Sequence, residues 1–354
     1  MTEEAAESSP EGARPHPSRR GFLAGAAGLT GVALAVGAWR PAFAADSPDA
    51  PAAAAAASLK GNFSGKVAIK IGETTAGFLL SAEGGNAFAD VVNEKVGADH
   101  LSRKHIAGVK YEDITVNCGT GMSKAFYDWV GTSVGAAGQA MNGSLVLTDF
   151  NLKVRSQNDF FNALITEVGM PALDAASKDT AKMTIKFAPE FTRSATRTGS
   201  LTGTNLRPQK WNVSNFKLTI NGVDTSRVSK IDALVIKQVF TNGVVGETGF
   251  GKQLVEVDIP NLKVTVAESH AIDFSKWHTD FVINGNHSSE GEKTGSLSFL
   301  AIDHKTELFR LDFFGLGIFA LDPDPLPGAA VRKVTAQLYC DKMVFSAPVA
   351  SPPA

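Results

Sequence analysis

Cysteine is scarce in this chain, which has 2 among 354 residues. Cys118 and Cys340 lie 222 positions apart, whereas a disulfide framework uses an even set of cysteines in a small domain. The scarcity therefore excludes a disulfide-rich fold. Two buried thiols are the expected arrangement, and a disulfide between them stays open as the alternative, since an oxidising compartment would permit it.

Excess charge of either sign is also lacking, because 34 Lys and Arg residues stand against 36 Asp and Glu residues, for a formal net charge of -2. The chain has no Lys/Arg tract and no net basic excess, so its composition gives no indication of nucleic-acid binding. The hydrophobic content of 44% is typical of a globular protein. The length is sufficient for about two domains of ~150 residues each.

No catalytic or metal-binding motif occurs in the context that its chemistry needs. The H-E-x-x-H zinc motif is absent, and the one G-x-S-x-G match, GTSVG at 131–135, follows a predicted helix rather than the strand that precedes a nucleophile elbow. His270 and His278 share one face of a predicted helix but stand two turns apart, too far to ligate one ion. His100 and His105 are placed in a polar loop. We therefore predict no catalytic, cofactor-binding or metal-ligating residue and no cofactor, and a hydrolase is the least favoured function.

Two segments imitate binding motifs without completing them. Residues 246–253, GETGFGKQ, match most of a phosphate-binding loop, but Gln253 stands where Ser or Thr must hold Mg²⁺. The residues that follow are strand-like, whereas the motif needs a helix N-terminus aimed at the phosphates. Residues 321–328, LDPDPLPG, are interpreted as a rigid turn rather than a calcium site.

The N-terminus has the pattern of a twin-arginine signal peptide over residues 1–44. Arg19 and Arg20 precede an apolar run rich in Gly and Ala, and residues 42–44, AFA, form a small-x-small cleavage site. The apolar run of roughly 15 residues is too short to span a membrane comfortably. The signal predicts contact with the twin-arginine translocase, a periplasmic or extracellular location and no stable membrane insertion. An Ala/Pro-rich linker follows at 45–61.

Alternating apolar residues indicate a mostly β protein with short helices. Val, Ile, Thr and Phe recur at period two, which is the pattern of strands. Helical periodicity is brief, at 126–130 and 274–282. The predicted strands lie at 66–71, 114–118, 143–147, 182–187, 216–220, 262–266, 295–300 and 335–340.

Four blocks of sequence recur in the same order in the two halves of the chain, which predicts a tandem duplication. ITVNCGTGMSKAFYDW (114–129) aligns without a gap with LKVTVAESHAIDFSKW (262–277). The other three matches are 142–147 with 294–299, 159–161 with 312–314, and 182–187 with 333–338. A segment rich in Thr, Ser, Gly and Arg separates the halves and is interpreted as a linker over 193–210.

The aromatic residues of each repeat are expected to belong to the core. Phe126 and Trp129 are three positions apart, as are Phe274 and Trp277, so each pair shares one face of a helix. Each such ring can bury about 150–250 Å². A short helix carrying this pair would cover the core of a small barrel, so we expect the tryptophans to be buried.

The segment KHIAGVKYEDITVNCGTGMSKAFYDWV (104–130) resembles the tail tube proteins of contractile-tailed phages and contractile injection systems. There, a basic residue and a Gly precede a short loop, a strand, a polar turn and a helix with Phe-Tyr-x-Trp. The later P-x-L-D-A sequence at 171–175 resembles the family's linker to its final strand. The second half is similar but more divergent, with FSKW in place of FYDW.

The resemblance implies two tandem small β-barrels, each with a short flanking α-helix, over 62–192 and 211–346, followed by a disordered tail at 347–354. It also implies a non-enzymatic structural protein that assembles with copies of itself or with other tail components into rings or tubes, and the signal peptide adds that this protein is exported. Three copies would then supply six barrels to a ring. The alternative is a periplasmic or secreted β-barrel binding module for a small ligand or a partner protein. A size measurement separates the two.

Overall fold

A computed structural model describes residues 65–95, 101–202, 211–242, 252–324 and 332–347, all within one compact unit, Ala54–Ala354. The predicted signal peptide and the tail from residue 348 onward lie outside the described residues. The fold is mostly β, as expected, and all eight predicted strands are present. No described helix is both long and apolar enough to cross a membrane.

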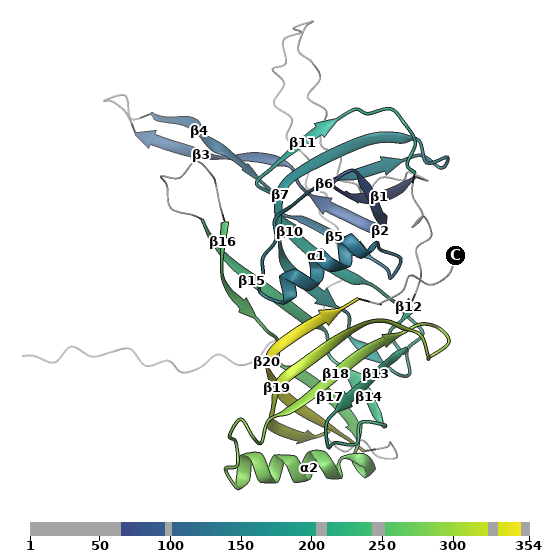
Figure 1. Ribbon diagram of the computed structural model, residues 1–354. Coiled ribbons are helices and arrows are strands. Elements are labelled where there is room, and N and C mark those ends of the chain that lie inside the picture. The colour runs from purple at the N-terminus through teal and green to yellow at the C-terminus, as the bar shows by residue number, and fades with distance from the viewer. Residues whose placement is uncertain (1–64, 96–100, 203–210, 243–251, 325–331, 348–354) are drawn as a thin grey trace, which may run out of the picture. The chain divides into compact units, whose positions relative to one another are not determined.

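The first sheet closes into a six-stranded barrel (Figure 1). Each strand pairs antiparallel with its neighbours, and the pairing of β10 with β7 completes the circle. Alternate side chains of these strands point inward, where residues such as Ile69, Val116 and Ile185 are fully buried. In order around the barrel, the strands are β1 (Lys66–Ile71), β6 (Met141–Thr148), β7 (Val154–Met170), β10 (Met183–Ala188), β5 (Ile114–Cys118) and β2 (Thr74–Gly84).

The second sheet has a matching strand order but stays open, so the expectation of a second closed barrel is corrected. Its first and sixth strands, β13 and β14, do not pair with each other, whereas β1 and β2 do. In order across the sheet, its strands are β13 (Phe216–Ile220), β18 (Lys293–Leu300), β19 (Glu307–Pro323), β20 (Lys333–Ser346), β17 (Leu262–Ala267), β14 (Val228–Ile231) and β8 (Leu173–Asp174).

Two features stand where the sheet would close: β8 occupies the free edge of β14, and a polar bend follows β13. The turn after β13 makes a single bridge, from Ile220 to Val223, and the chain then leaves the ladder. The side chain of Asp224 accepts a hydrogen bond from the backbone N–H of Ser226 at 2.9 Å, the Asx-turn geometry that competes with strand pairing. The Thr225 hydroxyl donates to the Leu218 carbonyl at 2.7 Å, which holds the bend against the sheet.

Each sheet carries one of the two expected helices. Helix α1 (Lys124–Val134) begins after Ser123, whose side chain accepts a hydrogen bond from the Phe126 N–H at 3.4 Å. Trp129 is fully buried and lies against Phe160 and Phe187 of the barrel strands. Helix α2 (Ile272–His278) likewise buries its aromatic pair, with Trp277 6% exposed. The prediction that both tryptophans are core residues is confirmed.

Two hairpins were not foreseen, one of which forms a two-stranded sheet of its own while the other extends the first sheet. The first joins β3 (Ala87–Lys95) to β4 (Ser102–Tyr111), and the second joins β15 (Leu234–Asn242) to β16 (Lys252–Asp258). His105 therefore lies in a strand and not in the expected polar loop, because pairing with β3 orders a segment whose own apolar pattern is weak. His100 is outside the described residues.

Short strands occupy segments that were expected to be connectors. Within the expected linker, residues 193–195 belong to β11 (Phe191–Ala195), which pairs with β7 and stacks Phe191 on Phe161 at 4.4 Å. The P-x-L-D-A segment contributes β8 to the second sheet. Two further short strands pair with each other, β9 (Thr180–Ala181) and β12 (Trp211–Asn212). Strand β19 extends to Pro323, so residues 321–323 of the predicted proline-rich turn belong to a strand, and residues 325–328 lie outside the described residues.

Candidate functional site

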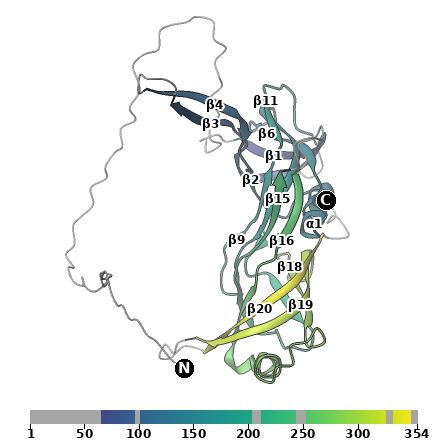
Figure 2. The same ribbon diagram turned by 90° about the vertical axis from the view of Figure 1, so that its left-hand side faces the viewer.

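A strand joint connects the two sheets and is the most distinctive feature of the described residues. Strand β15 leaves the second half of the sequence and pairs antiparallel with β7 of the barrel, from Leu234 opposite Met170 to Lys237 opposite Glu167. Figure 2 shows β15 and β16 running beside the barrel strands. Strand β8, from the first half, pairs in return with β14. Each half of the sequence therefore supplies a strand to the sheet of the other.

The joint is apolar where the strands meet. Leu234 and Ile236 of β15 are buried, as are Val168 and Met170 on β7. Burial of a side chain of this size contributes about 1.5–3 kcal/mol. At the edge of the apolar contact, Lys237 stands opposite Glu167, an oppositely charged cross-strand pair. The joint is thus built like the interior of a sheet rather than a surface contact.

The inner face of the β15–β16 hairpin also covers the end of helix α1. The side-chain amide of Gln238 donates a hydrogen bond to the Ser133 carbonyl in the last turn of that helix. Beyond the helix, Gly138 lies so close to Phe240 and Leu254 that a Cβ on Gly138 would stand 3.5 Å from the first and 3.8 Å from the second. Ser133 and Val134 are buried as a result.

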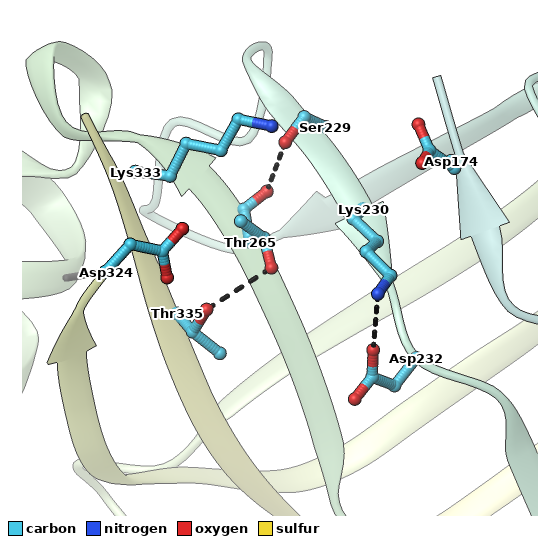
Figure 3. A pocket seen from close by; sticks show the side chains of 8 residues that line it. All are labelled: Asp174, Ser229, Lys230, Asp232, Thr265, Asp324, Lys333 and Thr335. Carbon is cyan, nitrogen blue, oxygen red and sulfur yellow. Dashed lines mark hydrogen bonds and ion pairs between the residues drawn. The ribbon is translucent and has the colours of Figure 1, made fainter. Parts of the chain in front are cut away.

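A polar hollow of about 330 Å³ lies on the outer face of the second sheet (Figure 3). Lys230 forms an ion pair with Asp232 at 3.6 Å, and Ser229 donates to the Thr265 carbonyl at 3.3 Å. The lining has no histidine or cysteine, and its one serine is engaged with the backbone. We find no nucleophile and base held together here. Its lining residues are Asp174, Ser229, Lys230, Asp232, Thr265, Asp324, Lys333 and Thr335.

The residues weighed in the sequence as ligands or nucleophiles are dispersed. His270 lies in a short 3-10 turn and contacts the Ser269 hydroxyl at 3.0 Å, while His278 ends α2. The described residues contain no cluster of three or more His, Cys, Asp or Glu side chains suited to a metal ion. Most of the phosphate-loop imitation is outside the described residues, but β16 begins at Lys252 where that motif would need a helix.

Both cysteines are free thiols, which answers the question left open by the sequence. Burial raises the pKa of the Cys118 thiol to about 12 and that of the Cys340 thiol to about 11. A thiol held protonated in this way is a poor nucleophile. Neither cysteine is therefore suited to catalysis at neutral pH.

Comparison with known proteins gives partial likenesses. No protein-family model matches the chain, and no curated protein matches it significantly. Among solved structures, the tube terminating cap of the anti-feeding prophage is 20% identical, with a TM-score of 0.32 over 37% of this chain and 88% of its own.

Two structures of an extracellular contractile injection system are similar to the same extent. The PVC sheath–tube complex in the extended state is 18% identical, with a TM-score of 0.33 over 37% of this chain and 89% of its own. The PVC sheath/tube terminator is 19% identical, with a TM-score of 0.32 over 37% of this chain and 93% of its own. At scores this low the likeness does not identify a shared function.

The joint had a sequence signal that the strand assignment passed over. Leu234, Ile236 and Phe240 alternate with polar or exposed positions, which is the pattern of a strand with one buried face. No local pattern identifies the partner strand of β15, because β7 precedes β15 by more than sixty residues in the sequence. The joint is therefore a pairing between distant segments and not a local sequence motif.

Proposed function

We propose that this chain is an exported, non-enzymatic structural subunit that assembles with copies of itself, in the manner of tail tube proteins. The observation that carries the proposal is the pairing of β15 with β7. The β15–β16 hairpin of the second unit lengthens the sheet of the first, so the barrel and the open sheet are joined through continuous backbone hydrogen bonding. A chain with this joint can extend the same construction from copy to copy.

The two sheets support a tandem duplication of one unit. The order β1-β6-β7-β10-β5-β2 corresponds to β13-β18-β19-β20-β17-β14. Helix α1 follows β5 in the chain, and α2 follows the equivalent strand β17. Gly143 stands opposite Phe160, and Gly295 stands opposite Phe313, at a register shift in both sheets. In this account the β15–β7 joint corresponds to a contact between two separate subunits. The contact became permanent because both units belong to one chain.

The same account favours export through the twin-arginine route, which carries proteins that are already folded. The support is the signal pattern of residues 1–44 in the sequence. A folded single chain is compact enough to cross, whereas a completed ring or tube is not. Assembly would therefore follow export, in the periplasm or outside the cell.

Sedimentation velocity of the purified chain tests the proposal over a range of protein concentrations. The expected result is a discrete species several times the chain mass of 37.2 kDa, with a population that grows with concentration. A chain that sediments as a monomer at every concentration would contradict self-assembly.

The binding-module alternative has one observation in its favour, the polar hollow beside Lys230 and Lys333. Two lysines and three aspartates around a hollow of about 330 Å³ suit a small polar ligand. A monomer whose melting temperature rises with an added small polar compound would support this alternative. Substitution of Lys230 by Ala should then abolish the rise.

A further inference from the structure

The β3–β4 hairpin has the same internal register as the docked β15–β16 hairpin. Val91 pairs with Ile106 in the first, and Phe240 pairs with Leu254 at the corresponding place in the second. A register shift immediately precedes this pair in both hairpins. Side chains that face the barrel in one hairpin therefore have defined counterparts in the other.

The counterparts differ sharply in exposure. In the docked hairpin, Phe240, Leu254 and Val257 are partly buried. In the β3–β4 hairpin the corresponding residues are Val91, Ile106 and Val109, which are 59%, 72% and 62% exposed. A two-stranded hairpin with an uncovered apolar face is only marginally stable in water. The face has the composition of a docking surface but lacks the cover that its counterpart has.

The second sheet has an uncovered edge where the first sheet receives β15. Strand β18 pairs with β19 only as far as Leu316, and residues 320–323 of β19 pair only with β20 among the described residues. By the register of the two sheets these residues correspond to 167–170 of β7, where β15 docks. Leu321 is partly exposed and Pro323 exposed, whereas Val168 and Met170 are buried.

The helix beside this edge is uncovered at its end as well. Val134, in the last turn of α1, is 3% exposed, and the carbonyl of the preceding Ser133 accepts a hydrogen bond from Gln238 of β15. Its counterpart in the alignment of the repeats is Val282, which follows α2 and is 43% exposed. The neighbouring Ile283 is 69% exposed. The second sheet thus has both parts of an acceptor surface, a strand edge and an apolar helix end.

We propose that the β3–β4 hairpin of one chain docks on residues 320–323 and the Val282–Ile283 surface of a second copy of the same chain. This inference rests on the proposed function and gives its contact. The new joint repeats the internal one, with β3 in the place of β15 and β19 in the place of β7 (Figure 1). The docking partner is a second copy because this chain carries both the donor hairpin and the acceptor edge. Both surfaces correspond to those of the β15–β7 joint that the chain already makes internally.

The contact is head-to-tail. The donor hairpin and the acceptor edge are different surfaces, so each copy has one of each to offer after docking. Repetition closes a ring where the rotation between copies allows it and otherwise continues as an open chain. The contact also removes the exposed strand edge, which is otherwise a site of uncontrolled pairing.

Single substitutions in the full-length chain test the contact by sedimentation velocity. Ile106→Asp places a charge on the donor face, and Ile283→Asp places one on the acceptor surface. Both side chains are largely exposed, so neither substitution should disturb the fold of a single chain. Each is expected to sediment as a monomer where the wild type is assembled. The control Ile302→Asp, at a position 82% exposed and outside both surfaces, should assemble normally.

Mixing the two variants gives the sharper result. The Ile106→Asp chain keeps its acceptor and the Ile283→Asp chain keeps its donor, so an equimolar mixture should form a heterodimer and nothing larger. A mixture that stays monomeric, or either variant assembling like the wild type, would overturn the contact. A wild-type chain that is itself monomeric would overturn the proposed function, whereas assembly that ignores both substitutions would overturn only this contact.

Discussion

Asn162 and Gly315 occupy the same place in β7 and β19 and share a left-handed backbone, with φ angles of 47° and 64°. Each follows by two residues the phenylalanine that pairs with a glycine, at a position where a side chain would clash with a neighbouring strand. A Cβ on Gly143 would lie 2.2 Å from the Lys70 carbonyl oxygen, and one on Gly295 would lie 2.6 Å from that of Thr219. Strands β7 and β19 therefore bend at equivalent positions and in the same way, at a residue with a left-handed backbone.

Gly315→Ala is expected to destabilise the chain by about 1–3 kcal/mol, because a left-handed backbone strains any residue with a Cβ. The new Cβ would also stand 2.5 Å from the Asp341 carboxylate. Asn162→Gly is the matched control and should be nearly neutral, since relief of strain offsets the loss of the exposed hydrogen bond to Glu190. Urea unfolding of both variants measures the difference. Equal effects would contradict the shared bend.

Trp129 and Trp277 should differ in their response to phenylalanine. The Trp129 indole N–H donates to the Gln139 carbonyl at 2.9 Å, whereas that of Trp277 is buried with no hydrogen-bond partner among the described residues. Trp129→Phe is therefore predicted to cost about 0.5–1.5 kcal/mol more than Trp277→Phe, because it removes the hydrogen bond to the Gln139 carbonyl.

Alanine at either position should cost about 3–5 kcal/mol, the usual range for a large aromatic removed from a core. Thermal unfolding of the four tryptophan variants separates the two effects. An Ala variant that melts at the wild-type temperature would show that its tryptophan lies at the surface and not in the core.

Much of this architecture is predictable from the sequence. Period-two patterns located the barrel strands, and the spacing of Phe126 and Trp129 identified the core helix. The pairing of β15 with β7 and the open edge of β19 were not predictable, since both depend on which distant segments meet. The open second sheet was not predictable either, since β8 comes from the first half of the chain and occupies the edge of β14 that β13 would need.

High pH is expected to weaken the fold through Cys118 and Cys340. Their pKa values are raised by burial from the ordinary value of 9.0 to about 12 and about 11, so the folded state keeps protons that the unfolded chain loses. Stability from this source is complete below about pH 9 and falls as pH rises from there, by up to about 1.4 kcal/mol per pH unit for each thiol.

Urea midpoints at a series of pH values measure this decline, with Cys118→Ala as the comparison. The variant should lose stability overall, yet show a shallower decline between about pH 9 and pH 11. An identical slope in the variant and the wild type would exclude Cys118 as a contributor.

Export is predicted to depend on Arg19 and Arg20. Replacement of both by Lys keeps the charge but removes the twin-arginine pattern, so unprocessed precursor should accumulate in the cytoplasm. Cell fractionation with immunoblotting follows the two forms. Mature protein outside the cytoplasm at the wild-type level would contradict the twin-arginine route.

Electron microscopy of the purified chain tests the central claim, that this is a self-assembling structural protein, most directly. The account predicts discrete rings or short tubes. The two related units of each chain should alternate around the circumference, with the same spacing between units of one chain as between units of neighbouring chains. A field of single particles of the size of one chain, at concentrations where the contact surfaces should be occupied, would contradict it.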